Sequence, residues 1–477
     1  MRTRHASAVR AIGRSQGDCG AKAGLTDRVA VVGAGAAGAL TAVQLMRQAE
    51  RAGHRLGVWL IDPAGHTGRG VAYGTPDARH LLNVPAARMS AFPDDPGHFL
   101  RWLTGRHPHA APGDFVARQE YGRYLGDVVE QTVAACRHAR LHRVRERVVA
   151  VREEGGRPVL RLSGGGELRA DAAVLALGSL GPDPAWAGPG LRASRRFVAD
   201  PWAPGALEGP AAQGDVLLVG TGLTMVDVAL TLAGPGRVLH AVSRHGLLPR
   251  EHLPAAAAAT APPQLEGAHT LEALRRGVRL HLAAGRRVCG DWRPALDGLR
   301  PVTAALWQRL SAADRRRFLA EDLRTWEVHR HRVAPATAGA LGELRARGLL
   351  RVGAGEVVRA VEDEDAVAVR LSDGRRLRVG AVVACTGARL DLRRTGDPLV
   401  RCLLEHGHAR PGPAGLGLDT GEEGRLVPTA GVRGVRLWTI GALRRGNLLE
   451  TTAVAEIRAQ AAEVAGAVRE ALAVRRP

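Results

Sequence analysis

Two glycine-rich turns hold the residues with the clearest potential for chemistry. The first, "VVGAGAAG", places Gly33, Gly35 and Gly38 in a G-x-G-x-x-G spacing directly after an apolar run. Glycines at this spacing permit a tight turn and let backbone amides approach a pyrophosphate at the N-terminus of the next helix. Asp62 ends the following apolar run, where a carboxylate can accept hydrogen bonds from ribose hydroxyls. The spacing therefore predicts a dinucleotide site.

The second turn, "VGTGLTMVD", repeats part of this pattern. It supplies Gly220, Gly222 and Thr224, and Met225 stands where the third glycine would be. A lone G-x-G is common, but here the flanking apolar run and the helical stretch behind it also repeat. We therefore predict a second dinucleotide site.

The strand after the second turn ends in Ser243 and Arg244 rather than in an acid. An acid there repels a 2'-phosphate, whereas arginine and serine can hold one. The pair favours NADPH, and NADH is not excluded. The alternative is that Arg244 only faces solvent. Two nicotinamide sites have no reason to face each other, so we expect the first turn to hold FAD and the second to deliver NADPH to it.

The elements around the two turns repeat one plan. A helix over 36–51 and a strand "LGVWLID" follow the first turn, and a meander of short strands closes on an apolar strand ending at Gly178. A helix over 222–233, a strand "VLHAVSR" and a second meander ending at Gly387 follow the second turn. This predicts an α/β fold with two Rossmann-like dinucleotide-binding domains, the second inserted in the first.

The expected domain organisation has four parts. Residues 1–26 are expected to be a disordered tail, and residues 27–205 the first part of the FAD-binding domain. Residues 206–375 are expected to bind NAD(P)H and to carry a helical insertion at about 255–345, and residues 376–477 to complete the FAD-binding domain. The insertion is either a cap over the site or an ornament, and the sequence favours neither.

Charge and composition exclude several functions. The net charge is +20, but Lys22 is the sole lysine among 67 basic residues, and the arginines are mostly interspersed with acidic and apolar residues. Aromatic residues make up only 3%, so the stacking residues of a nucleic-acid surface are missing. We expect no nucleic-acid partner.

Membrane, metal and disulfide roles are also disfavoured. No apolar run is long enough to span a bilayer and no secretory signal is evident, so we expect a cytoplasmic protein. The five cysteines contain no C-x-x-C pair. Histidine clusters at 107–109, 329–332 and 405–408 have neighbouring arginines that oppose a cation, so we expect no metal site. Instead, Arg330 and Arg332 could meet an acidic substrate.

The chain resembles a family of bacterial flavoproteins with two dinucleotide-binding domains. The residues that carry the resemblance cover nearly the whole chain after residue 27 and include "VVGAGAAG", "GRGVAYGT", "HLLNVPAARMSAFP", "FVARQEYGRYL", "VGTGLTMVDVAL", "SRHGLLPR", "WEVHRHRVAP" and "IGALRRGNLLETTAVAEIR". Within that family it is similar to an FAD-dependent urate hydroxylase and to an aspartate N-monooxygenase that makes nitrosuccinate. The ornithine and lysine N-hydroxylases and the flavin-containing monooxygenases are more distant relatives.

The resemblance implies roles for further residues. The first glycine turn and Asp62 would hold the ADP part of FAD, with Arg69 near its phosphates or adenosine. Residues near the flavin ring would be His80, Asn83 and Met89, and at the C-terminal end Gly441 and a helix beginning near Thr452. Many relatives have Gly-Asp where this chain has Gly441 and Ala442, and Asp419 is a speculative substitute for that carboxylate. Arg118 matches an arginine of the relatives that makes either a salt bridge or a ligand contact.

The resemblance also implies the reaction. It is an FAD-dependent, NAD(P)H-consuming monooxygenation of a small polar metabolite, urate-like or an amino-acid amine, with O2 as co-substrate and a flavin hydroperoxide as the oxygen donor. No catalytic residue follows from the sequence, nor does the oligomeric state. A flavin reductase or oxidase without oxygen insertion, and a non-catalytic flavin-binding partner protein, remain as alternatives.

Overall fold

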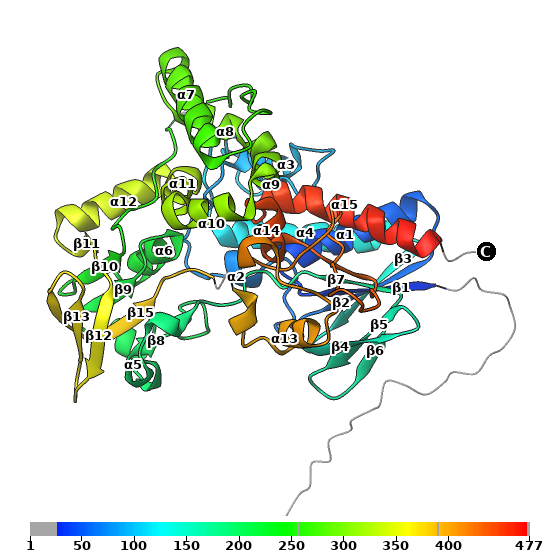
Figure 1. Ribbon diagram of the computed structural model, residues 1–477, viewed down its shortest axis with the longest axis horizontal. Coiled ribbons are helices and arrows are strands. Elements are labelled where there is room, and N and C mark those ends of the chain that lie inside the picture. Colours follow the sequence, from blue (N-terminus) through cyan, green and yellow to red (C-terminus); the bar gives the residue numbers. More distant parts are fainter. Residues whose placement is uncertain (1–25, 255–256, 389–390, 475–477) are drawn as a thin grey trace, which may run out of the picture.

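The computed structural model describes residues 26–254, 257–388 and 391–474 (Figure 1). It contains two five-stranded parallel sheets, each with an antiparallel three-stranded meander. The predicted tail, apart from Thr26, lies outside the described residues. The predicted α/β fold with two Rossmann-like domains is confirmed.

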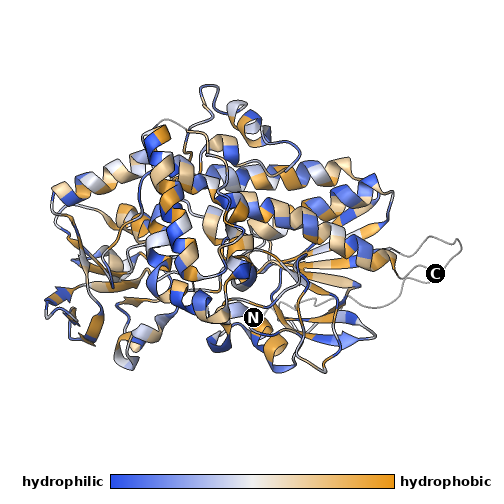
Figure 2. Cartoon of the chain, turned by 45° about the horizontal axis from the view of Figure 1, so that its top comes forward, coloured by the Kyte–Doolittle hydropathy of each residue, from blue (hydrophilic) through white to orange (hydrophobic). Residues whose placement is uncertain are grey.

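The first sheet has the strand order β16-β7-β1-β2-β3, and all neighbours are parallel. Its strands are β1 (Asp27–Val32), β2 (Leu56–Ile61), β3 (Ala139–Val144), β7 (Ala172–Leu175) and β16 (Leu437–Thr439). Helices α1 (Ala36–Arg51), α4 (Arg118–Ala135) and α15 (Val454–Ala473) pack together over one face. Since both faces are covered, the central strands are continuous apolar runs, and Figure 2 shows them as mostly hydrophobic.

The second sheet has the order β11-β10-β9-β15-β8 and is also parallel. Its strands are β8 (Phe197–Val198), β9 (Val216–Val219), β10 (Leu239–Ser243), β11 (Leu350–Ala354) and β15 (Ala381–Ala384). Helices α6 (Leu223–Leu232) and α12 (Pro335–Ala346) pack against it. The predicted boundaries at 205 and 375 differ from this sheet membership, because β8 precedes the first boundary and β15 follows the second.

The two meanders repeat as expected. They comprise β4 (Val148–Glu154), β5 (Arg157–Leu162) and β6 (Glu167–Arg169), and β12 (Val357–Glu362), β13 (Val367–Leu371) and β14 (Arg376–Val379). Remaining helices are α2 (Gly70–Tyr73), α3 (His98–Thr104), α5 (Pro189–Ala193), α13 (Pro398–Glu405), α14 (Arg445–Leu448) and seven short 3-10 turns, of which η4 (Arg300–Val302) and η7 (Gly441–Arg444) concern the site.

The predicted insertion is helical. It contains α7 (Leu271–Cys289), α8 (Arg293–Gly298), α9 (Thr303–Arg309), α10 (Ala312–Glu321) and α11 (Leu323–Arg330). Helix α7 projects from the body of the molecule, and α9 to α11 lie across the two domains (Figure 1). Trp307 Nε1 donates to the Gly446 carbonyl at 2.7 Å, so the insertion is fastened to the C-terminal segment of the first domain.

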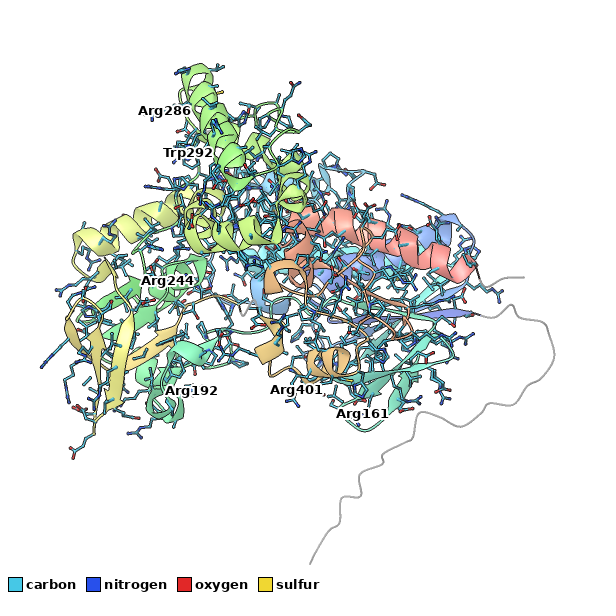
Figure 3. All side chains as sticks on the ribbon, viewed as in Figure 1. Arg161, Arg192, Arg244, Arg286, Trp292 and Arg401 are labelled. Carbon is cyan, nitrogen blue, oxygen red and sulfur yellow. The ribbon has the colours of Figure 1, made fainter. Side chains whose placement is uncertain are left out.

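Exposed arginines are spread over the molecule. Those labelled in Figure 3 lie on different elements of both domains and of the insertion: Arg161, Arg192, Arg244, Arg286 and Arg401. They do not gather on one element. Among the described residues, no helix is both long and apolar enough to cross a bilayer.

Candidate functional site

Two glycines of the first turn are required by the fold itself. Gly33 has φ +103°, and a Cβ there would lie 2.4 Å from the Ala176 carbonyl oxygen. A Cβ on Gly38 would lie 1.8 Å from the Gly33 carbonyl oxygen. Any side chain at these positions would force the backbone apart. Glycine is therefore needed at both positions for the close packing of strand and helix.

Gly35 is different. It is the N-cap of α1 with φ −64°, and a Cβ there would meet only the Gly70 Cα atom at 3.6 Å, an ordinary contact. The protein therefore has no packing reason for glycine at this position. Helix α1 also has no side-chain N-cap, which leaves its first amides available to an anion. The open space and the free amides fit a pyrophosphate.

Asp62 and Arg69 lie beside this turn. The Asp62 carboxylate accepts hydrogen bonds from the amides of Ala34 and Ala64, both at 2.8 Å, and keeps lone pairs for a ribose. Arg69 is exposed, and the loop that carries it is fixed by the Gly68 amide, which donates to the Ala34 carbonyl at 2.8 Å. The positions suit the expected roles in FAD binding, which remain predictions.

The second turn also has one glycine that packing requires and one that it does not. Gly220 has φ +112°, and a Cβ there would lie 2.2 Å from the Cys385 carbonyl oxygen. Gly222 is the N-cap of α6, and a Cβ there would meet only Arg324 Nη1 at 3.8 Å. Thr224 lies half-buried in the first turn of that helix, and Met225 fills the core where the first turn has its third glycine. The space at Gly222 fits a second diphosphate.

Arg324 is a candidate residue that the sequence did not reveal. It comes from α11 of the insertion, and its Nη2 donates to the carbonyls of Thr221 at 3.0 Å and Leu247 at 2.7 Å. Burial lowers the pKa of this guanidinium, but the group stays cationic at neutral pH. It therefore adds positive charge at the second turn. No motif marks it, because it lies about a hundred residues from the turn in sequence.

Ser243 and Arg244 have different environments. Ser243 Oγ shares a hydrogen bond with Thr221 Oγ1 at 2.8 Å and accepts one from the Gly246 amide at 3.1 Å, so it shapes the loop. Arg244 is exposed at the end of β10 (Figure 3), with no ion-pair partner in the described part of the chain. The arrangement leaves both predicted alternatives for Arg244, a 2'-phosphate or solvent.

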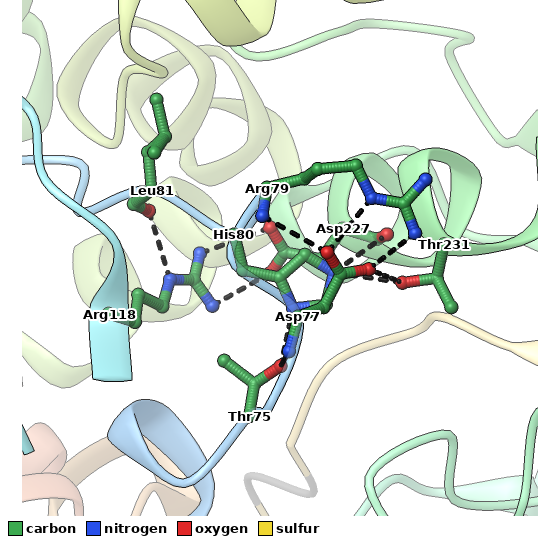
Figure 4. A network of polar contacts seen from close by, with 8 residues as sticks. All are labelled: Thr75, Asp77, Arg79, His80, Leu81, Arg118, Asp227 and Thr231. Carbon is green, nitrogen blue, oxygen red and sulfur yellow. Dashed lines mark hydrogen bonds and ion pairs between the residues drawn. The ribbon is translucent and has the colours of Figure 1, made fainter. Parts of the chain in front are cut away.

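His80 and Arg118 join the two domains (Figure 4). The His80 ring is buried and shares hydrogen bonds with Thr75 Oγ1 at 2.7 Å and Thr231 Oγ1 at 2.9 Å. Arg118 forms an ion pair with Asp227 at 2.7 Å, which selects the salt-bridge alternative for this arginine. Both nitrogens of His80 are thus used by protein partners. Its expected place near the flavin ring remains a prediction.

Asp227 is the buried carboxylate of this network. Burial raises its pKa, while the Arg118 guanidinium opposes that rise. The opposite holds for Asp77, whose pKa is lowered because Arg79 donates to it. Asp77 also accepts from Thr231 at 2.9 Å. The first domain is therefore attached to α6 by a set of charge-assisted hydrogen bonds, which fixes the orientation of the two turns.

The C-terminal segment returns to the first turn. Gly441 has φ +75°; its amide donates to Gln460 Oε1 at 3.0 Å, and its carbonyl accepts from Thr451 Oγ1 at 2.9 Å. A Cβ on Gly441 would lie 3.9 Å from Ala37 Cβ, at the start of α1. Helix α15 begins at Val454, close to the expected start near Thr452, which is exposed.

Two further candidate residues have protein partners. Arg410 binds the Asp419 carboxylate at 2.7 Å and Asn447 Nδ2 donates to it at 3.1 Å, so both oxygens are used by the protein. Met89 is 2% exposed and packs in the core of the first domain. A role for either residue near the flavin remains a prediction.

Asn83 and Thr452 line one of two adjoining cavities. One of about 50 Å³ is bounded by the start of α15, and the other, of about 110 Å³, continues from it under residues 252–254. His252 Nε2 bonds with the Asn83 carbonyl at 2.9 Å, and burial lowers the pKa of His252 to about 4. The two cavities share Pro85, Arg88, His252, Asp297 and Arg332 as wall residues. We call them together the interdomain cavity.

The insertion forms one wall of this cavity. Arg330 pairs with Glu450 at 2.9 Å and Arg332 pairs with Asp297 at 2.5 Å. Burial lowers the pKa of His331, which also lines the cavity and is neutral at pH 7. His329 is half-buried and packs against the Trp292 ring. Among the described residues, no group of three or more His, Cys, Asp and Glu side chains is arranged to hold a metal ion.

Residues 30–180 match a family model described as FAD-NAD(P)-binding. This match contains the first glycine turn and ends before the second. No curated protein matches the sequence significantly.

Solved structures with the same fold include three flavoprotein monooxygenases. L-lysine 6-monooxygenase from Pseudomonas syringae is 19% identical with a TM-score of 0.62, over 94% of this chain and 100% of that chain. Ornithine hydroxylase from Pseudomonas aeruginosa is 16% identical with a TM-score of 0.60, over 94% and 99%. A flavin-containing monooxygenase from Stenotrophomonas maltophilia is 18% identical with a TM-score of 0.51, over 94% and 99%. At these identities the likeness shows the fold.

Proposed function

We propose that the protein is an FAD-dependent, NADPH-consuming oxidoreductase that acts as a monooxygenase on a small molecule. The observation that carries this proposal is the open space at Gly35 and at Gly222, beside glycines that packing does require. Glycine at an open position is explained by a ligand that approaches the backbone. Two such positions, each at the start of a helix after a parallel strand, support two diphosphates.

The chain's residues divide between the two cofactors. Gly35, the α1 amides, Asp62 and Arg69 would hold FAD, and Gly222, Thr224, Arg324 and Arg244 would hold NADPH. A bound flavin supplies electron transfer from NADPH to O2. The first turn of α15 lies at the interdomain cavity, where its positive end would stabilise negative charge.

Monooxygenation is favoured over disulfide reduction. Four cysteines are described, and all are free: Cys136, Cys289, Cys385 and Cys402. They come from separate elements, and burial raises the pKa of Cys385, so this thiol stays protonated. The named monooxygenases with this fold support oxygen insertion. Urate-like compounds and amino-acid amines are the finer substrate candidates that the sequence resemblance implies.

The domain organisation proposed with this function follows the sheets. Residues 27–175 and 437–473 build the FAD-binding sheet and its helices, and residues 197–384 build the NADPH-binding sheet together with the helical insertion. The insertion contacts both, through Arg324 at the second turn and Trp307 at the C-terminal segment. We therefore take it as a cap rather than an ornament.

The test measures the visible absorption spectrum of the protein, the rate of its bleaching by NADPH, and the rate of O2 uptake. The purified protein is expected to be yellow, to be bleached by NADPH without oxygen, and to take up O2 faster when its substrate is added. Urate, aspartate and ornithine are added in turn, and peroxide is measured alongside. A colourless protein refutes the proposal. Peroxide equal to the O2 consumed with every compound favours an oxidase, and a yellow protein that NADPH does not bleach favours a non-catalytic partner.

A further inference from the structure

We propose that the interdomain cavity binds a small molecule with one carboxylate on an apolar body, held by Arg88 and Arg332. This inference deepens the proposed function, on which it rests, by naming the substrate class. It differs from the polar metabolite that the sequence resemblance implies. Three features of the cavity support it: the charge balance of the wall, an unpartnered guanidinium atom of Arg332, and the apolar residues that line the larger cavity.

Among the described residues, the guanidinium groups at this cavity outnumber the carboxylates that pair with them by one. Five guanidinium groups line the cavity, whereas the carboxylates that line it are Asp297, Glu450 and Glu456. Asp291 pairs with Arg293 at 2.8 Å and adds a fourth carboxylate. Arg300 pairs with Glu456 at 2.5 Å and Arg330 with Glu450, so those charges cancel. Arg88 and Arg332 are left with a single carboxylate.

That carboxylate, Asp297, has too little negative charge for the guanidinium groups around it. Asp297 lies within 4 Å of three guanidinium groups, at 2.5 Å from Arg332 and at 3.7 Å from both Arg88 and Arg330. One carboxylate cannot neutralise Arg88 and Arg332 together. A second carboxylate, supplied by a ligand, completes the balance.

Arg332 has a buried donor atom without a partner among the described residues. The residue is 2% exposed, and its Nε is buried with no hydrogen-bond partner among the described residues. A buried charged donor without a hydrogen bond costs free energy, because it has lost its hydration without gaining a partner. Arg88, by contrast, keeps 42% of its side chain exposed and can turn toward a ligand. The two guanidiniums provide one fixed and one adjustable contact.

The larger cavity also has several apolar residues in its wall. Pro85, Phe115, Leu253, Pro254 and Pro294 line the larger cavity, and Phe115 packs against the His252 ring with centroids 5.0 Å apart. Because its pKa is about 4, His252 adds no charge there at neutral pH. A hydrocarbon or aryl body gains free energy by covering these side chains, whereas a second charged group would lose its hydration.

The carboxylates among the described wall residues, which would pair with a free amine, already have arginine partners. Glu450 accepts from Trp326 and Arg330, Glu456 from Arg300, and Asp297 from Arg332. A cationic head group would also meet the excess positive charge. The cavity therefore favours an acid over an amine.

The test compares head groups on one body. Isothermal titration calorimetry of the full-length protein is performed with benzoate, benzamide and benzylamine, which are anionic, neutral and cationic. We expect benzoate to bind at least tenfold more tightly than benzamide, and benzylamine to bind most weakly. Pentanoate is expected to bind more tightly than glutarate, which carries a second carboxylate.

Variants tie the preference to the named arginines. Arg88→Gln is expected to weaken benzoate about tenfold and benzamide less than twofold, because only the anion uses the charge. Arg286→Gln, which removes an exposed arginine of α7, is the matched control and should change neither. Arg332→Gln should act like Arg88→Gln if it folds, and Arg88→Gln decides the matter if it does not.

Three outcomes overturn the inference: equal binding of benzoate and benzamide, tighter binding of benzylamine, or equal losses in Arg88→Gln and Arg286→Gln. Flavin content and NADPH bleaching are recorded on the same samples. A yellow, bleachable protein that binds no acid refutes the substrate class alone. A colourless protein refutes the proposed function independently of the calorimetry.

Discussion

Gly35→Ala is expected to remove FAD while leaving the fold intact. The backbone at position 35 has φ −64° and ψ −169°, which alanine adopts readily. The new Cβ would lie 3.6 Å from Gly70 Cα, which is an ordinary van der Waals contact. A glycine replaced at such a position stabilises a protein by about 0.4–1 kcal/mol, because the unfolded chain loses freedom. The flavin-free variant should therefore unfold at the same urea concentration as the flavin-free wild type, or slightly above it.

The loss of FAD follows from the place of that Cβ. It occupies the space in which a diphosphate meets the α1 amides, and two charge-assisted hydrogen bonds at about 1.5 kcal/mol each are at stake. Their loss lowers FAD affinity roughly 100-fold. Gly33→Ala is the contrasting change, because its Cβ would lie 2.4 Å from a backbone oxygen at φ +103°. That variant should lose several kcal/mol of stability.

The assay has two readouts and a matched control. FAD affinity is measured by fluorescence titration of the flavin-free protein, and stability by urea unfolding. Gly222→Ala is the control, since it makes the same change at the second turn, where the Cβ would meet only Arg324 Nη1 at 3.8 Å. It should keep FAD and raise the KM for NADPH. If Gly35→Ala binds FAD as tightly as the wild type, the assignment of the first turn is refuted.

Three further predictions concern charges. Arg244→Ala should raise the KM for NADPH at least tenfold and that for NADH less than twofold, because only NADPH carries a 2'-phosphate; equal increases would mean that Arg244 only faces solvent. Asp227→Asn should lower the free energy of unfolding in urea by about 3 kcal/mol, since it leaves the partly buried Arg118 guanidinium without its counter-charge. Arg118→Met combined with Asp227→Leu should recover most of that loss, and a single variant as stable as the wild type contradicts this. The folded-state pKa of His252, about 4, lies below the ordinary 6.5, so the unfolded state takes up the proton first and stability falls as pH drops from 6.5 to 4. His252→Gln should flatten that part of the stability profile, and an unchanged profile would show that His252 is not the group responsible.

Local sequence patterns are enough to predict the two turns and the elements around them. Gly33 and Gly220 need positive φ, and their spacing to the following helices is a local property of the backbone. The helix expected over 36–51 is α1, and the strand ending at Asp62 is β2, because apolar periodicity reports which face is buried.

Packing between distant segments brings the side chains of the site together. His80 meets Thr231, which lies 151 residues away, and Asp419 is bound by Arg410. Arg324 reaches the second turn from a part of the insertion that none of the quoted motifs includes. Sheet membership of β8 and β15 likewise depends on pairing between distant strands. Backbone conformation is set by neighbours in the chain, whereas the partners of a side chain and the walls of a cavity are set by packing between segments that the sequence keeps far apart.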